Sequence, residues 1–109
     1  MSTEQKIQKQ LDENPIMLYM KGTPAMPQCG FSAKASSLLK STEIDFAYCN
    51  VLEAPFIFEK LPAFSNFPTY PQLFIKGELI GGSDIVESML ASGELLPMLQ
   101  QAACVESST

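Results

Sequence analysis

The strongest constraint on the fold is a five-residue segment, Ile16-Met17-Leu18-Tyr19-Met20, that is apolar at every position. Pro15 and Gly22 bound this segment so closely that a buried helix has too little room. A strand that is apolar on both faces lies in the middle of a sheet, with helices covering each side. We therefore expect a layered structure of helices and strands built around residues 16–20.

Helix and strand patterns alternate on either side of this strand. The expected elements are a helix over 2–13, strand 16–20, a helix from 31, strand 46–51, a helix from 55 that Pro62 kinks or closes, a hairpin of strands 73–75 and 78–80, a helix that ends at Gly93, and a last helix with Leu95, Leu96 and Leu99. This order implies a mixed four-stranded sheet with helices on both faces, as in the thioredoxin-like fold.

Two spacings predict how helices begin. Ser2 with Gln5 has the spacing of a capping box, and Asp84 with Glu87 could cap the helix after the hairpin. Pro55 suits the first turn of its helix, where the missing N–H matters least.

Length and charge exclude several classes of protein. The 109 residues form one domain, with residues 105–109 expected to be a frayed tail. A net charge of −5 without a basic stripe argues against nucleic acid as a partner. No stretch approaches the roughly 20 apolar residues of a membrane span, and residues 1–10 lack a secretory core. We expect a cytoplasmic protein that does not bind membranes.

The number and spacing of the cysteines also favour a cytoplasmic protein. Cys29, Cys49 and Cys104 are an odd number at wide spacing, which favours a reducing compartment over a disulfide framework. We expect Cys49 to pack within a strand and Cys104 to lie exposed near the tail. The chain has no histidine, and three scattered thiols cannot supply the four sulfurs of an all-thiolate site. If a cluster binds, some ligands come from outside the chain.

Cys29 is the candidate reactive residue. It opens the motif Cys29-Gly30-Phe31-Ser32 after a Pro-rich loop, and Ser32 stands where a redox motif carries its second cysteine. A lone thiol must find its partner in another protein, a small thiol or a metal. Its position at a helix N-terminus favours the thiolate, and Lys21 could add positive charge nearby. The alternative, a small buried apolar cysteine, explains neither Gly30 nor the rigid loop.

Two further segments suggest a ligand. Residues 67–72 hold two prolines, and a cis Tyr70-Pro71 bond would expose backbone groups to an extended peptide, unless the segment is an ordinary turn. In residues 81–84, two flexible glycines precede a helix N-terminus, and Asp84 adds a carboxylate there. A diglycine, however, is often only a turn. Together with a thiolate and a lysine, these features suit glutathione.

The combination resembles the single-domain monothiol glutaredoxins of the C-G-F-S type, in particular their bacterial cytoplasmic member. The resemblance covers about residues 7–99. It rests on the motifs Lys21-Gly22, Cys29-Gly30-Phe31-Ser32, Phe67-Pro68-Thr69-Tyr70-Pro71-Gln72-Leu73 and Gly77-Glu78-Leu79-Ile80-Gly81-Gly82-Ser83-Asp84.

The resemblance implies a carrier of a [2Fe-2S] cluster. Two protomers would share one cluster as a homodimer, each giving Cys29 and one bound glutathione, and would deliver it to apo iron-sulfur proteins. The alternative function is a glutathione-dependent thiol-disulfide oxidoreductase acting on glutathionylated proteins, which needs only one cysteine. A third possibility is a binding module that pairs with a BolA-like protein.

The resemblance also assigns roles to residues around glutathione. Lys21 would contact it near the sulfur and the glycine carboxylate, and Tyr70 would pair with the cysteinyl part. The γ-glutamyl end would lie against a backbone N–H of Ser83 and the Asp84 carboxylate. The remaining site residues implied are Phe31, beside the cluster, Thr69, Pro71 as the cis proline, and Gly82.

Three positions depart from the family pattern. Phe58 stands where relatives often have an arginine for the glycine carboxylate, so that contact is not carried over, and we expect Lys60 to take part of its role. Phe67 replaces a common tryptophan. Ser83 replaces a cysteine that some relatives use as a second thiol.

Overall fold

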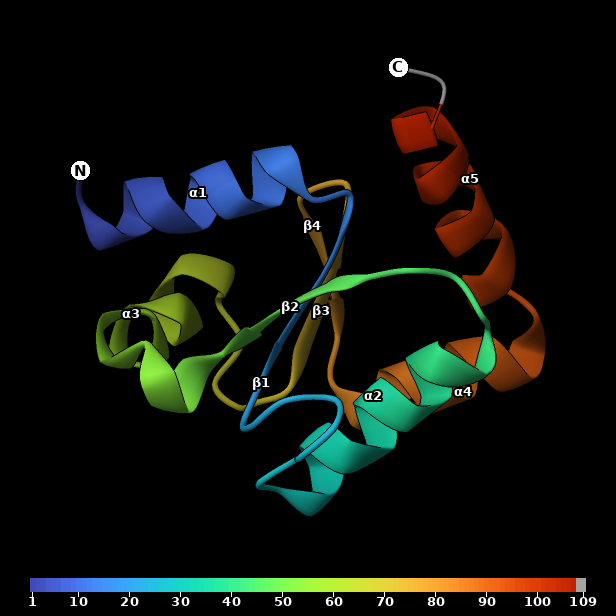
Figure 1. Ribbon diagram of the computed structural model, residues 1–109, viewed down its shortest axis with the longest axis horizontal. Helices are drawn as coiled ribbons and strands as arrows, with labels where there is room; N and C mark the ends of the chain where they lie inside the picture. Colours follow the sequence, from blue (N-terminus) through green and yellow to red (C-terminus); the bar gives the residue numbers. More distant parts are fainter. Residues whose placement is uncertain (108–109) are drawn as a thin grey trace.

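The structure, a computed structural model, describes the backbone of residues 1–107 and the side chains of residues 1–103. Figure 1 shows a central sheet with helices on both sides. The elements in chain order are α1 (Thr3–Glu13), β1 (Ile16–Met20), α2 (Gly30–Ser41), β2 (Ala47–Asn50), the short 3-10 helix η1 (Val51–Glu53), α3 (Pro55–Ser65), β3 (Gln72–Ile75), β4 (Glu78–Gly81), α4 (Ser83–Ser92) and α5 (Leu95–Ser107).

The four strands form a mixed sheet in the order β2-β1-β3-β4. β1 runs parallel to β2 and antiparallel to β3, and β3 and β4 form the hairpin. All five residues of β1 are buried, as expected for a strand with helices on both faces. The expected sheet and the thioredoxin-like fold are therefore confirmed.

Alternate residues of β1 point into two separate cores. Ile16, Leu18 and Met20 pack on one face against α2, α4 and α5. Met17 and Tyr19 pack on the other face against α1 and α3. The carboxyl end of β1 and the amino ends of α2 and α4 then come together at one end of the sheet, which is where the cavity described below lies.

The local rules that predicted the turns and caps hold at three places. Ser2 accepts a hydrogen bond from the Gln5 N–H, and the Gln5 side chain bonds back to Ser2, so α1 has its capping box. Lys76 and Gly77 form the two-residue hairpin turn with φ values of 52° and 79°. Gly93 ends α4 with a φ of 85°.

Pro62 does not close α3, which continues to Ser65. A proline inside a helix has no N–H for the carbonyl four residues before it, which here is that of Phe58. The Tyr70 hydroxyl donates a hydrogen bond to this carbonyl at 2.8 Å, and it lies 3.3 Å from the carbonyl oxygen of Ile57. The side chain of Tyr70 thus replaces the donor that Pro62 lacks.

The expectation that Asp84 and Glu87 cap α4 is wrong. Gly82 is the N-cap residue, and no side chain caps this helix. Both carboxylates instead form ion pairs with Lys34 of α2. Their spacing of three residues places them on one side of α4, where the cation on the neighbouring helix meets both.

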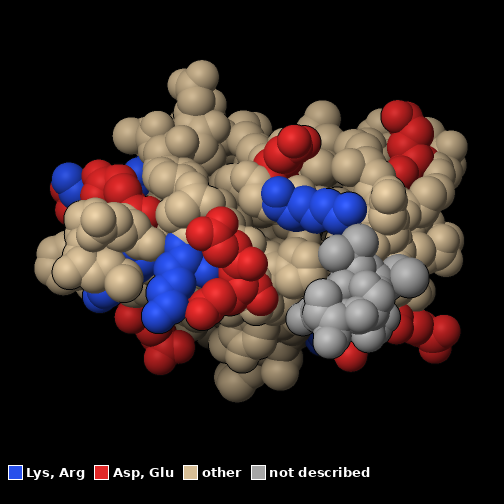
Figure 2. Space-filling model, turned by 90° about the horizontal axis from the view of Figure 1, so that it is seen from above, with Lys and Arg blue, Asp and Glu red and all other residues tan. Residues whose placement is uncertain are grey.

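The C-terminal helix α5 continues through residues 105–107, where we expected the tail to begin. The rest of that expected tail, residues 108–109, and the side chain of Cys104 lie outside the described residues. Within the described part of the chain, none of the helices combines the length and the hydropathy needed to cross a bilayer. Seen from above α1 and α5, Lys side chains lie beside Asp and Glu side chains, so charges of both signs are mixed on this face (Figure 2).

Candidate functional site

Cys29 occupies the N-cap position of α2 in an extended backbone conformation, with φ −151° and ψ 138°. Its side chain is partly exposed. At this position the thiol lies beside the N–H groups of the first helical turn, which have no partner within the helix. The expected place of the thiol at a helix N-terminus is confirmed.

The loop before Cys29 is held by hydrogen bonds at both ends. The Gln28 N–H donates to the Lys21 carbonyl at 2.9 Å, and the Gly22 N–H donates to Asn50 Oδ1 at 2.9 Å. Gly22 has a φ of 91°, and a Cβ added there would lie 2.6 Å from both the Met26 carbonyl oxygen and the Gln28 nitrogen. Only glycine fits this turn without strain, so Gly22 helps to fix where Cys29 lies.

The pKa of the Cys29 thiol lies below its ordinary value. The largest cause is a hydrogen bond from the backbone of Ser32, which favours the thiolate, followed by partial burial, which opposes it. The Phe31 backbone, the Ser32 side chain and the Lys21 charge lower it further. A lowered pKa raises the thiolate fraction near neutral pH, and the thiolate is the form that attacks disulfides and binds metals.

Ser32 is fully buried and links the two parts of the site. Its Oγ accepts a hydrogen bond from the Lys21 N–H at 3.0 Å, and its hydroxyl also stabilises the Cys29 thiolate. From the sequence we saw Ser32 only as a missing second cysteine. In the structure it joins the end of β1 to the start of α2.

A cavity of about 870 Å³ opens beside Cys29, a volume within the usual range for small-ligand sites of about 300–1,000 Å³. It brings together nine of the candidate residues from the sequence, while their individual roles remain predictions. These residues are Lys21, Cys29, Phe31, Thr69, Tyr70, Pro71, Gly82, Ser83 and Asp84.

The cis-proline loop and the start of α4 meet closely at one side of the cavity. The Tyr70-Pro71 bond is cis, as expected. A Cβ added at Gly82 would lie 3.3 Å from the Pro71 carbonyl oxygen and 3.4 Å from the Phe67 ring, so glycine allows this approach. The Gln72 side chain donates hydrogen bonds to the carbonyls of Phe67 and Thr69 at 3.0 and 3.1 Å, which holds the loop from behind.

Phe58 and Tyr70 form an aromatic wall of the cavity. The rings of Phe58 and Tyr70 have centroids 5.2 Å apart, and Lys21 Nζ lies 5.7 Å from the Phe58 ring centroid. A cation over an aromatic face is attracted by its π-electrons, so Phe58 helps to place the Lys21 ammonium. Lys60 is exposed on α3 and is not among the described residues that line the cavity. Its position therefore does not support the expectation that Lys60 takes over part of the role of the missing arginine.

Five lining residues were not selected from the sequence as site residues. They are Phe58, Pro62, Phe67, Pro68 and Ile85. Phe58 and Phe67 had been noted only as departures from the family pattern. Ile85 is 44% exposed on a helix whose apolar face should be buried, and no periodicity in the sequence distinguishes such a residue from a core residue.

The second described free thiol has the opposite character. Cys49 lies in β2, partly buried against the core that holds α1 and α3, and burial raises the pKa of its thiol. Within the described residues, no three or more His, Cys, Asp and Glu side chains gather as a metal site. Of the two described thiols, only Cys29 lines the cavity.

Residues 16–80 match the family model described as Glutaredoxin, and together with the fold and the cavity this shows that the chain belongs to the glutaredoxin family. It is 50% identical over 103 residues to "Glutaredoxin 4" of Haemophilus influenzae (strain 86-028NP), covering 94% of this chain and 96% of that one. It is 59% identical over 86 residues to "Probable monothiol glutaredoxin GrlA" of Legionella pneumophila, covering 79% of this chain and 97% of that one.

Solved structures of glutaredoxins are also similar to this chain. Reduced apo GrxS14 of poplar is 39% identical, with a TM-score of 0.79 over 93% of each chain. A buckwheat glutaredoxin in complex with glutathione is 25% identical, with a TM-score of 0.80 over 91% of this chain and 88% of that one.

Proposed function

We propose that this glutaredoxin binds glutathione in the cavity beside Cys29 and, as a pair of protomers, carries a [2Fe-2S] cluster to apo iron-sulfur proteins in the cytoplasm. The observation that carries the proposal is the lone, partly exposed Cys29 thiol of lowered pKa at the edge of a cavity of ligand size. A buckwheat relative has been crystallised with glutathione, which supports the same ligand here.

The cavity offers complementary groups along its length. Lys21 provides a positive charge near the thiol, and Asp84 provides a negative charge at the start of α4. Glutathione carries carboxylates at both ends and one ammonium group on its γ-glutamyl residue. We place that ammonium group at Asp84, the γ-glutamyl carboxylate at the N–H groups of the first turn of α4, and the glutathione sulfur beside Cys29.

The cluster is the cargo, and the sulfur count supports shared coordination. A [2Fe-2S] cluster takes four thiolate ligands, and Cys29 is the only described thiol at the cavity. Two protomers with one bound glutathione each supply four sulfurs. Phe31 is 62% exposed next to Cys29 and would cover one side of the cluster, which limits the access of water.

Anaerobic reconstitution tests the proposal. Protein mixed with iron, sulfide and glutathione should give a coloured dimer, whereas Cys29→Ser should remain colourless and monomeric. Cys49→Ser is the matched control, because it removes a thiol that lies outside the cavity, and it should still form the dimer. A wild-type protein that stays colourless under these conditions contradicts cluster carriage.

The second candidate is an oxidoreductase, favoured by the lowered pKa of Cys29. The Cys29 thiolate would attack the glutathione sulfur of a glutathionylated protein, forming a new disulfide and releasing the protein as a thiolate. A second glutathione thiolate would then attack that disulfide, restoring Cys29 and leaving oxidised glutathione. Fast turnover of a glutathionylated peptide, with colourless protein after reconstitution, would favour this function over cluster carriage.

A BolA-like protein is a further proposed partner at the same face, since Phe31 and Ile85 are exposed apolar side chains beside the cavity. Co-purification of such a protein in the absence of iron tests this. Retention of the partner by Cys29→Ser would show binding without a cluster, and loss of the partner from both proteins would count against it.

A further inference from the structure

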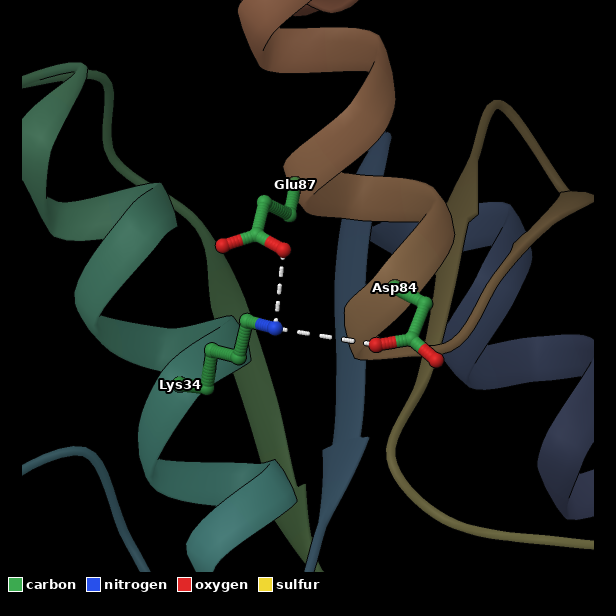
Figure 3. Close-up of polar contacts among 3 residues, drawn as sticks. All are labelled: Lys34, Asp84 and Glu87. Carbon is green, nitrogen blue, oxygen red and sulfur yellow. Dashed lines mark ion pairs between the residues drawn. The ribbon is translucent and has the colours of Figure 1, made fainter.

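Three charged side chains join α2, the helix that begins after Cys29, to α4, the helix that carries the acidic group of the cavity. Lys34 Nζ lies 2.9 Å from Glu87 Oε1 and 3.6 Å from Asp84 Oδ1 (Figure 3). Asp84 lines the cavity, while Lys34 and Glu87 are not among the described residues that do so. One cation is therefore shared between a carboxylate inside the site and a carboxylate outside it.

The two ion pairs are unequal. The distance to Glu87 is that of a charge-assisted hydrogen bond, whereas the distance to Asp84 exceeds it. The side chain of Asp84 is 87% exposed, and one of its carboxylate oxygens points away from Lys34 (Figure 3). Asp84 therefore keeps an oxygen free for a second cation.

A second cation at that oxygen would also lie near the ammonium group of Lys34. Like charges this close repel, and each weakens the attraction of the other to the shared carboxylate. Glu87 acts in the opposite direction, because it holds Lys34 in a shorter ion pair and so reduces its hold on Asp84.

We propose that Lys34 is a positioning residue that competes with the ligand's ammonium group for Asp84, and that Glu87 limits this competition. Together they set how strongly the cavity prefers γ-glutamyl thiols that carry a free α-amino group. The proposal rests on the proposed function, in which Asp84 binds the ammonium group of glutathione.

Calorimetric titration of glutathione into three proteins tests the competition. Lys34→Met should bind glutathione about two- to fivefold more tightly than the wild type, the range expected for an exposed ion pair, and Glu87→Gln should bind it more weakly by a similar factor. Both differences should shrink as salt is added, because exposed charges are screened. For a glutathione analogue without the α-amino group, Lys34→Met should not bind more tightly than the wild type, because no ammonium group then competes with Lys34 for Asp84.

Lys9→Met is the matched control, because it removes the same charge from α1 on the opposite face of the sheet. It should leave the affinity for glutathione unchanged, and unfolding midpoints identify any variant that folds poorly. Lys34→Met binding glutathione equally or more weakly, or binding the analogue more tightly as well, overturns the competition alone. A wild-type protein that binds no glutathione overturns this proposal and the proposed function together.

Discussion

The lowered pKa of Cys29 results mainly from residues close to it in the chain. The main stabiliser of its thiolate is the backbone of Ser32, and the Ser32 hydroxyl contributes as well. The same Ser32 oxygen accepts the Lys21 N–H. A second cysteine at this position would provide an internal disulfide partner; serine instead provides a hydrogen bond donor and leaves the thiolate available to outside ligands.

Ser32→Ala should raise the pKa of Cys29 toward its ordinary value, because the alanine variant loses the hydroxyl donor. The backbone hydrogen bond remains, so the rise should be partial. The measurement is the pH dependence of alkylation by iodoacetamide in a Cys49→Ser, Cys104→Ser background. Because only the thiolate reacts, the midpoint of the rate profile should move to higher pH and the rate at neutral pH should fall.

Ser37, an exposed serine of the same helix, gives the control for this variant, since Ser37→Ala should leave the alkylation midpoint where it is. A midpoint that also stays unchanged in Ser32→Ala would contradict the role of the hydroxyl. Cys49 offers a contrast of opposite sign. Burial raises the pKa of its thiol, so a protein that keeps only Cys49 should be alkylated at higher pH than one that keeps only Cys29.

At the scale of the elements, α3 depends on the cis-proline loop. Pro62 leaves the Phe58 carbonyl without its helical donor, and the Tyr70 hydroxyl donates in its place. Phe58 and Tyr70 also form the aromatic wall of the cavity. One hydrogen bond therefore stabilises the helix and helps to fix the position of Phe58 at the cavity.

Tyr70→Phe should lower the free energy of unfolding by about 1–3 kcal/mol, because it leaves a partly buried carbonyl without a donor. Urea denaturation followed by circular dichroism measures the change. Tyr48→Phe removes a hydroxyl from a side chain that is 46% exposed on the edge strand β2, and it should change stability by less than about 0.5 kcal/mol. Equal stability of Tyr70→Phe and the wild type would show that the hydroxyl does not support α3.

Alanine substitutions at Gly22 and Gly30 test the account of the loop before α2. Gly22→Ala should cost about 1–3 kcal/mol, because the residue has a positive φ and its Cβ would overlap two backbone atoms. Gly30→Ala should be tolerated, since a Cβ there meets nothing within 4 Å and the residue begins a helix. Urea denaturation of both proteins measures the difference, and similar losses for both would contradict the account of the loop.

At the scale of the whole molecule, much of the fold could be predicted from the sequence. The all-apolar β1 determines that helices cover both faces, and the hairpin turn has a characteristic composition. Pro62 was expected to kink or close α3, and the helix does not close there, while the expected cap by Asp84 and Glu87 is wrong. In both cases the deciding partner lies in a distant segment: Tyr70 for α3 and Lys34 for the two carboxylates. Local rules cannot identify such partners.

The candidate site was predictable to a similar extent. Cys29 and the residues of the motifs around it are recognisable from short sequences, and the structure gathers them around one cavity. The apolar residues that line the cavity and the bridging role of Ser32 could not be predicted. In sequence, an apolar residue that lines a cavity looks the same as a core residue, and a buried serine that bridges two segments looks the same as any other serine of a helix. Their roles depend on packing between segments far apart in the chain.

The central claim is that Cys29 supplies one ligand in four, and the composition of the reconstituted species tests it most directly. The coloured protein should be separated anaerobically from unbound glutathione, and its iron, sulfide, glutathione and protein should be quantified together with its molar mass. The account predicts a dimer of the 11.9 kDa chain with one [2Fe-2S] cluster and two glutathione molecules. A cluster that is retained without glutathione, or on a single protomer, would contradict it.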